Sequence, residues 1–292
     1  MPSPAVAVAT LTPTEHVADL TIEQLSDFLS CPFLYRQRHV LEQHGTFSSD
    51  RQAARLALRA LPQVMREQQQ TGQALAPQDI EAVVREEADT TVESALADAV
   101  RLLSLWHDQL GRSMQPVAVD TRLHLELDDD GDRWAISGRI PIAFTAPATT
   151  YPQVAVVQVV PLLWSADRIR SDLLLPLTLL GARQALDLHE LTSIRLHQVT
   201  YAGEVREVAP LVDDRRCQEA LGLAAAARAG LRAYLAALDG AQPWPPARGS
   251  QDCSGAACPF VTPCVEAFGG SVRWTSSGSG TGPGTNPGPG SR

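Results

Sequence analysis

Three of the five cysteines in the chain lie close together near its C-terminus, at Cys253, Cys258 and Cys264. Thiolates are soft ligands that suit zinc ions and iron–sulfur clusters, and either kind of site usually needs four ligands. Two cysteines remain for the fourth position. Cys31 precedes a proline at the predicted end of a helix, whereas Cys217 falls in the first turns of a long Ala/Leu-rich helix. We therefore predict a metal site made of Cys31 and the C-terminal run, with Cys217 outside it; the alternative for Cys31 is a small buried apolar residue.

Composition limits the classes of function. The chain has 292 residues, of which 44% are hydrophobic and 20% charged, as expected of a soluble globular fold. Its net charge of -9 argues against a general nucleic-acid coat, but a local basic groove is compatible with it. All 24 positively charged residues are arginine, so no mechanism can use a lysine.

The N-terminal stretch Met1–Thr14 has no basic start and no long apolar run, which argues against a secretory signal. No segment approaches the roughly 20 apolar residues of a membrane helix. We therefore expect a cytoplasmic protein with no membrane partner, in which cysteines stay reduced and available to metals.

The remaining sequence predicts one domain over residues 19–268, between a loose leader at 1–18 and a disordered Gly/Ser/Pro tail at 271–292. Its helical part covers about 19–112. Thr21 and Gln24 form a capping box at the first helix, and two more helices are expected over Arg51–Gln70 and Ile80–Leu110.

A sheet core is predicted over about 116–240, ahead of the cysteine motif at 253–264. The expected elements are strands over 117–127, 134–145, 154–163, 194–201 and 205–208, and helices over 172–186 and 213–238. Asp128–Asp132 is expected to be a hairpin turn, with a calcium loop as the alternative. The almost continuously apolar third strand should be central. The fold class is therefore α/β or α+β, with a mixed central sheet flanked by helices.

The two ends of this domain resemble the iron–sulfur branch of the RecB-like PD-(D/E)XK nuclease superfamily. The N-terminal match is Leu25-Ser26 followed by Cys31-Pro32-Phe33-Leu34-Tyr35, and the C-terminal match is Pro245-Pro246 followed by the three cysteines. The family usually spaces those cysteines Cys-x2-Cys-x5-Cys, whereas here the first gap is four residues. The resemblance implies a restriction-endonuclease-like core and a [4Fe–4S] cluster on Cys31, Cys253, Cys258 and Cys264, with zinc as the alternative.

The middle of the chain departs from the family at the positions that perform the chemistry. Family members carry Gly-x-Ile-Asp on one strand and Asp/Glu-x-Lys on the next, and the two carboxylates hold a divalent metal. Here Gly138-Arg139-Ile140 is followed by Pro141, Gln158 replaces the second acid, and Val160 replaces the lysine. A proline and an amide cannot hold a hard cation. We therefore expect no catalytic residue and no catalytic magnesium.

The resemblance implies an inactive nuclease-type domain that acts in DNA binding or repair, with a helicase or an active nuclease as partner. Tyr35, Arg36, Arg38 and Arg139 are the candidate DNA contacts, the alternative being solvated arginines beside a core tyrosine. Two other functions remain open. One is an active metal-dependent DNA exonuclease whose acid has moved to Asp120 or Glu126, and the other is a zinc-stapled protein-interaction module.

Overall fold

A computed structural model describes residues 19–43, 45, 47–88, 93–129, 131–146, 151–187, 193–237, 244, 258–260, 263–264 and 267. Cys253, the predicted leader and the predicted tail lie outside the described residues. The helices are α1 (Ile22–Ser30), α2 (Pro32–Tyr35), η2 (a π-helix, Arg36–Val40), α3 (Ser49–Thr71), α4 (Pro77–Glu86), α5 (Glu93–Gln109), η3 (a 3₁₀-helix, Gly111–Ser113), α6 (Ala166–Ser171), α7 (Leu174–Ala185) and α8 (Asp214–Ala236).

One mixed sheet organises these helices. Its strands are β1 (Asp19–Thr21), β2 (Gln115–Asp129), β3 (Asp132–Thr145), β4 (Gln153–Val160), β5 (Ile194–Thr200) and β6 (Val205–Val208). The order is β1-β3-β4-β5-β6, and β2 pairs with β3 as a long hairpin. The β4–β5 pair is parallel and is connected through α6 and α7, whereas β2–β3, β3–β4 and β5–β6 are antiparallel.

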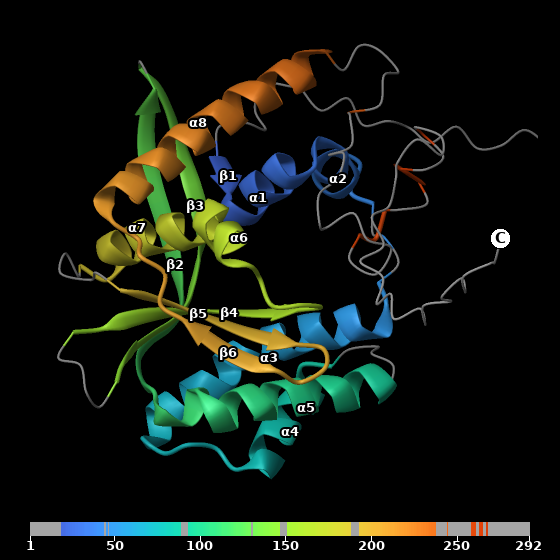
Figure 1. Ribbon diagram of the computed structural model, residues 1–292, viewed down its shortest axis with the longest axis vertical. Coiled ribbons are helices and arrows are strands. Elements are labelled where there is room, and N and C mark those ends of the chain that lie inside the picture. The colour runs from blue at the N-terminus through green and yellow to red at the C-terminus, as the bar shows by residue number, and fades with distance from the viewer. Residues whose placement is uncertain are drawn as a thin grey trace, which may run out of the picture.

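The sheet divides into two parts that share few hydrogen-bonded residues. β3 pairs with β4 only from Ile142↔Ala155 to Phe144↔Gln153, and beyond this junction the two strands separate. In Figure 1 the hairpin β2–β3 rises toward α7 and α8, while β4, β5 and β6 lie over α3, α4 and α5. The separation of the strands opens the space in which the candidate site lies.

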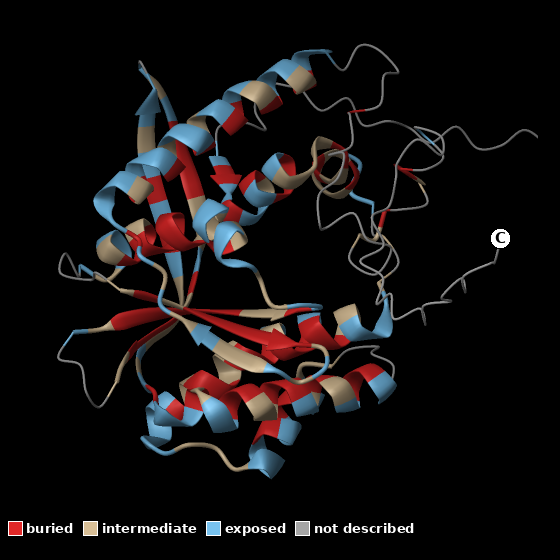
Figure 2. Cartoon of the chain, viewed as in Figure 1, coloured by how far each residue is buried: buried red, intermediate tan, exposed pale blue. Residues whose placement is uncertain are grey.

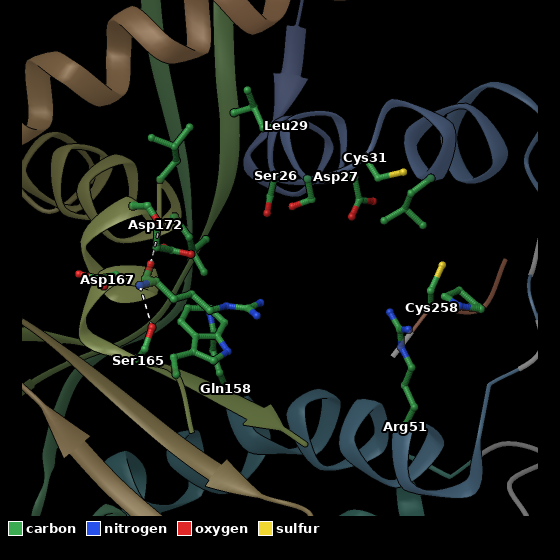
Figure 3. Close-up of a pocket in the computed structure, with 18 residues that line it drawn as sticks. Ser26, Asp27, Leu29, Cys31, Arg51, Gln158, Ser165, Asp167, Asp172 and Cys258 are labelled. Atoms are coloured by element: carbon green, nitrogen blue, oxygen red, sulfur yellow. Dashed lines mark hydrogen bonds between the residues drawn. The ribbon is translucent and has the colours of Figure 1, made fainter. Parts of the chain in front are cut away.

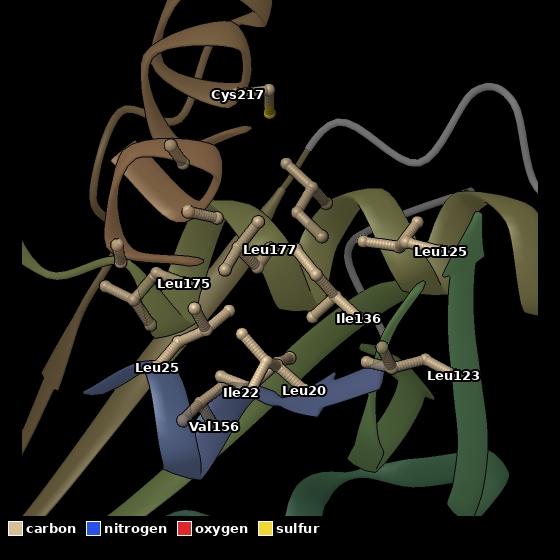
Figure 4. Packing of buried hydrophobic residues seen from close by; sticks show 14 of the residues in the cluster. Leu20, Ile22, Leu25, Leu123, Leu125, Ile136, Val156, Leu175, Leu177 and Cys217 are labelled. Atoms are coloured by element: carbon tan, nitrogen blue, oxygen red, sulfur yellow. The ribbon is translucent and has the colours of Figure 1, made fainter. Parts of the chain in front are cut away.

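Two hydrophobic cores correspond to these two parts. The upper core packs α1, α7 and α8 against the hairpin, through side chains such as Leu25, Ile136 and Leu177 (Figure 4). The lower core packs α3, α4 and α5 against the sheet, around Met65 and Trp106. Figure 2 shows the buried stripes of these helices turned toward the strands and their exposed faces turned outward. The amphipathic spacing of the helices therefore determines which layer each one joins.

Local sequence signals explain several element boundaries. The capping box at α1 is confirmed, since the Thr21 hydroxyl accepts from the Gln24 amide at 3.0 Å and the Gln24 side chain accepts from the Thr21 amide at 2.8 Å. The hairpin turn is confirmed at Gly131, whose φ of 88° favours glycine. β4 has two neighbouring strands and a nearly continuous buried run, as predicted for a central strand.

The prediction of a single helix over Ile80–Leu110 is wrong. α4 ends at Glu86, where the chain turns, and α5 begins at Glu93. The apolar faces of both helices have the same spacing, so the pattern alone did not reveal the break. The mixed α+β class with a mixed central sheet flanked by helices is confirmed. No helix in the described part of the chain is long and apolar enough to cross a membrane.

Candidate functional site

A cleft of about 880 Å³ lies between the two parts of the sheet. α1 and α2 form one wall, α6 and the start of α7 form another, and β4 with the start of α3 forms the floor (Figure 3). Its polar and charged lining residues are Ser26, Asp27, Ser30, Arg51, Gln158, Ser165, Asp167, Arg168, Ser171 and Asp172, and Cys31 and Cys258 close one end. The cleft therefore brings together the N-terminal helix, the central strand and the C-terminal segment.

Gln158 lies on the floor of this cleft, at the end of β4. Its side chain makes no hydrogen bond within the described part of the chain, and it is half-buried. A neutral amide there can donate and accept hydrogen bonds but supplies no charge to balance a cation. Val160, two residues on, is buried in the sheet and does not line the cleft.

Pro141 lies on β3, one residue before the junction with β4. It lacks an amide hydrogen, and the β2–β3 pairing passes over it, from Thr121↔Ile140 to Val119↔Ile142. Asp120 stands opposite it on β2 with a φ of 53°, a left-handed conformation that aspartate adopts more readily than most residues. The proline is thus accommodated by a local irregularity of the neighbouring strand.

The relocated acid proposed for an active enzyme points elsewhere. The Asp120 carboxylate accepts from Arg66 of α3 at 2.9 Å and also from Arg139 of β3, and it does not line the cleft with Gln158. Glu126 is exposed on β2, with its carboxylate 4.0 Å from His124. The structure therefore does not bring either residue together with the floor of the cleft.

Asp27 of α1 is a carboxylate that sequence reasoning missed. It lines the cleft and accepts from Arg38 at 2.6 Å and from His39 at 2.8 Å. Both partners come from the π-helical turn that follows α2, so this turn is positioned by the charge on α1. The sequence signal was the aspartate inside the apolar stripe of α1, between Leu25 and Phe28.

Asp172 lies at the junction of α6 and α7. Its carboxylate accepts from the Leu175 amide at 3.1 Å and so caps α7. Desolvation raises the pKa of this carboxyl, and the hydrogen bonds from the helix and the charges of Arg168 and Arg216 oppose that shift. The carboxylate thus caps α7 at the cleft wall.

An arginine covers a tryptophan on the same wall. The Arg168 guanidinium lies 4.4 Å from the centre of the Trp164 ring. The Trp164 backbone is held by Gln198, whose side-chain oxygen accepts its amide at 3.3 Å, and by Arg206, which donates to its carbonyl at 2.6 Å. Gln198 also accepts from Arg206, so its oxygen is fixed and its buried Nε2 has no partner in the described residues.

The predicted cysteine ligands are partly brought together. Cys31, Cys258 and Cys264 share one small cluster with Phe33 and Phe260, although Cys31 and Cys258 are 227 positions apart in the sequence (258 − 31). Within the described residues no three His, Cys, Asp or Glu side chains are arranged to hold a metal ion. The fourth predicted ligand, Cys253, lies outside those residues.

A glycine brings a second segment against this cluster. A Cβ placed on Gly45 would lie 2.5 Å from the Pro259 Cβ and 2.6 Å from the Pro259 carbonyl oxygen. Only a glycine fits such a close backbone approach. The loop between η2 and α3 is therefore packed directly against the turn that carries Cys258.

Cys217 lies apart from this cluster. It is buried in α8 within the upper core, as Figure 4 shows, and burial raises the pKa of its thiol. A thiol that resists ionisation is a poor metal ligand.

The candidate DNA contacts occupy four different environments. Tyr35 is 4% exposed and stacks on Trp244 with ring centroids 6.0 Å apart; burial raises its pKa to about 12. Arg36 is half-buried, and its Nε has no hydrogen-bond partner in the described residues. Arg38 pairs with Asp27, and Arg139 with Asp120. Tyr35 thus lies in the hydrophobic core, as in the alternative to a DNA contact. Arg38 and Arg139 already contact carboxylates.

No protein-family model matches the chain, and no curated protein matches it in sequence. Among solved structures, a candidate exonuclease from Eubacterium rectale aligns at 11% identity with a TM-score of 0.47, over 80% of this chain and 88% of that one. The structure of SSO0001 aligns at 15% identity with a TM-score of 0.31, over 84% of this chain and 94% of that one.

Proposed function

We propose that this chain is a nuclease-like domain that binds DNA in the cleft without cleaving it, and that a cysteine-held metal centre ties its two ends together. The observation that carries the proposal is the position of Gln158. It stands on the cleft floor, on the strand and at the residue where the resemblance to PD-(D/E)XK nucleases requires the metal-holding acid.

The element order supports the nuclease-like part of the proposal. A helix is followed by an antiparallel hairpin, a central strand, crossover helices and a parallel strand, as the resemblance implies. The junction of β3 and β4 then brings the strand of Pro141 beside the strand of Gln158, where the two acids would meet in an active member. Hydrolysis of this type needs a divalent cation between two carboxylates, and neither Pro141 nor Gln158 supplies a carboxylate.

The remaining carboxylates of the cleft are committed to other partners. Asp27 is engaged by Arg38 and His39, Asp167 pairs with Arg170, and Asp172 caps α7. The chain has no lysine to stabilise a leaving oxygen. Retained cleavage would therefore need a rearrangement of several ion pairs.

The donor set at the closed end of the cleft fits a soft metal centre. Cys31, Cys258 and Cys264 are gathered within one apolar cluster, and Cys253 lies five positions before Cys258 in the sequence. We propose a [4Fe–4S] cluster held by these four cysteines, with zinc as the alternative. Its contribution is structural: a metal bound by both ends of the chain stabilises the folded state by its binding free energy.

Binding in the cleft is supported by its shape and its arginines. Arg51 of α3 lies at the floor of the cleft and Arg168 of α6 lies on its wall. A guanidinium plane stacked on an aromatic ring, as at Trp164, is a surface on which a nucleobase can stack. We propose DNA as the ligand, and a helicase or an active nuclease as the partner that supplies DNA ends. We place the protein in the cytoplasm as part of this proposal.

The test measures DNA binding and cleavage with one set of purified proteins. Anisotropy of labelled single-stranded and forked DNA should show binding that weakens with salt, and gels should show no cleavage with Mg²⁺ or Mn²⁺. Gln158→Glu introduces a negative charge on the cleft floor and should weaken binding about tenfold, which corresponds to about 1.4 kcal/mol.

The matched control is Gln73→Glu, which makes the same charge change at an exposed position outside the cleft. It should leave binding unchanged. Cleavage that is lost in Asp120→Ala would show an active enzyme with a moved acid. Absence of DNA binding together with bound zinc would favour the protein-interaction module.

A further inference from the structure

A second concave surface lies at the N-terminal end of α1, with a volume of about 660 Å³. We name it the arginine groove. Its lining comes from β1, α1, β2, β3 and the start of α7, and consists of Thr21, Ile22, Glu23, Arg122, Leu123, His124, Ser137, Gly138, Arg139 and Leu174. Leu174 also lines the cleft, so the two surfaces adjoin at this side chain.

Two arginines face each other across the strands of this groove. Arg122 of β2 is the direct register partner of Arg139 of β3, and the next pair on the same face is His124 with Ser137. Side chains directly opposite in an antiparallel pair have Cβ atoms about 5 Å apart, and like charges there destabilise the pair. The Asp120 carboxylate offsets part of this repulsion through Arg139, whereas Arg122 has no such partner among the described residues.

The hydrogen-bonding groups of this pair are largely unused. Arg122 makes no hydrogen bond or ion pair within the described part of the chain. Arg139 is 56% exposed and donates there only through Nη1, to the side chain and backbone of Asp120. Two guanidinium groups with open donors and a neighbouring hydroxyl match the oxygens of a phosphate group, which accept several hydrogen bonds at once.

The carboxylates near the groove leave the Arg122 guanidinium without a partner among the described residues. Asp120 occupies one nitrogen of Arg139, Glu23 is 73% exposed and lies 3.4 Å from Arg38, and Glu126 is 4.0 Å from His124. None of them contacts Arg122. Arg122 therefore faces solvent without a counter-ion from the described residues, whereas Arg139 already has one in Asp120.

We propose that the arginine groove binds a phosphate group, with Arg122 as the principal contact and Arg139, Ser137 and His124 beside it. The phosphate could belong to the backbone of a nucleic-acid strand that leaves the cleft past Leu174, or be free in solution. The first source rests on the proposed function, and the second does not.

The experiment compares three variants in the full chain. Arg122→Gln removes the charge at the groove, Arg122→Glu reverses it, and Arg133→Gln is the control. Arg133 is exposed on the same strand as Arg139, lies outside the groove and faces Asp128. Binding of inorganic phosphate is measured by ³¹P NMR titration at constant ionic strength, and binding of labelled single-stranded DNA by anisotropy at several salt concentrations.

Wild type and Arg133→Gln should bind phosphate, and both Arg122 variants should lose at least tenfold in affinity. If DNA occupies the groove, Arg122→Gln also lowers the salt slope of DNA binding by about 1. Arg122→Glu carries a second signature, because it replaces a like-charged pair by an opposite pair. Its melting temperature should rise by about 1 to 3 °C while its phosphate affinity falls, a combination that a purely structural arginine would not give.

The outcomes separate this inference from the proposed function. DNA binding that persists unchanged in the Arg122 variants, with no phosphate binding by wild type, would overturn the groove and leave the cleft proposal standing. Phosphate binding that depends on Arg122, in a protein that binds no DNA, would support the groove and overturn the cleft proposal. Equal phosphate binding in wild type and all variants would show that the arginine pair is not the site.

Discussion

Replacing Cys31 by serine tests whether the two ends of the chain share one metal. The described structure already places Cys31 in contact with the apolar cluster of Cys258 and Cys264. If four thiolates hold one centre, the loss of any one of them should release it. The prediction is that Cys31→Ser, purified anaerobically, contains less than a tenth of the wild-type metal and lacks its colour.

The magnitude follows from the loop that the metal closes. Cys31 and Cys258 are 227 positions apart (258 − 31), and the chain-entropy relation for a cross-link closing a loop of this length gives about 5 kcal/mol of stabilisation. This is an upper value, because the unfolded chain is more compact than a random coil. The loss should nevertheless exceed that of an ordinary buried Cys→Ser change.

The structure also predicts where the variant loosens. α1 is held by Leu25 and Phe28 within the upper core, which contains none of Cys31, Cys258 and Cys264. The C-terminal segment, in contrast, contacts the domain through Phe260 and the cluster around Phe33. Limited proteolysis should therefore cut beyond α8 while α1 stays protected.

Metal analysis, urea unfolding and proteolysis with mass spectrometry measure these three effects. Cys217→Ala is the control, since Cys217 is buried in α8 away from the cluster, and it should keep its full metal content. A Cys31→Ser protein with wild-type metal and an unchanged unfolding midpoint would refute the staple. Loss of metal in the Cys217 variant alone would show that Cys217, and not Cys31, is the fourth ligand.

Three further predictions concern packing and protonation. Gly45→Ala should lower the free energy of unfolding in urea by about 1 to 3 kcal/mol, because its new Cβ would overlap Pro259. A loss below about 0.5 kcal/mol, roughly the effect of an ordinary surface change, would show that the two segments do not touch in solution. Asp172→Asn should raise the melting temperature at neutral pH, since it keeps a capping oxygen and removes a desolvated charge. Asp172→Ala removes the capping oxygen and should lower the free energy of unfolding by about 0.5 to 2 kcal/mol. Equal melting temperatures for the two variants would contradict this. His107 donates from Nε2 to Gln68 at 2.9 Å, and burial lowers its pKa below 6.5, so its contribution to stability is complete above pH 6.5 and is lost as the pH falls through the folded-state pKa. Unfolding free energies between pH 7.5 and 5 should fall accordingly, and His107→Gln should flatten this part of the profile; a variant with the wild-type slope would exclude His107 as the cause.

Much of the fold was predictable because its signals are local. The capping box, the glycine of the hairpin and the apolar run of β4 each act within a few residues, and the structure confirms them. Elements without such signals were missed. β1 has three residues and exists only through its pairing with β3, and α6 is a six-residue helix whose cap, Ser165, looks like part of a loop.

The sequence revealed some residues of the candidate sites but not the contacts between residues from different elements. The spacing of the cysteines and the amide at Gln158 are visible in the sequence. The pairing of Asp27 with Arg38 and the facing of Arg122 and Arg139 are not, because they depend on a helix turn and on a strand register that only the folded chain defines.

The two cores of the fold differ in how much of the chain each one requires. The lower helices α3, α4 and α5 are consecutive in sequence, so much of their packing can form as they leave the ribosome. The upper core joins α1 to α8, and Asp214 follows Ser30 by 184 positions (214 − 30). At usual rates of synthesis, α1 waits about 10 to 40 s for its partner helix. During that interval the apolar face of α1, with Leu25 and Phe28, can be covered only in part, by the hairpin and by α7, and its exposed remainder is available to chaperones until α8 arrives.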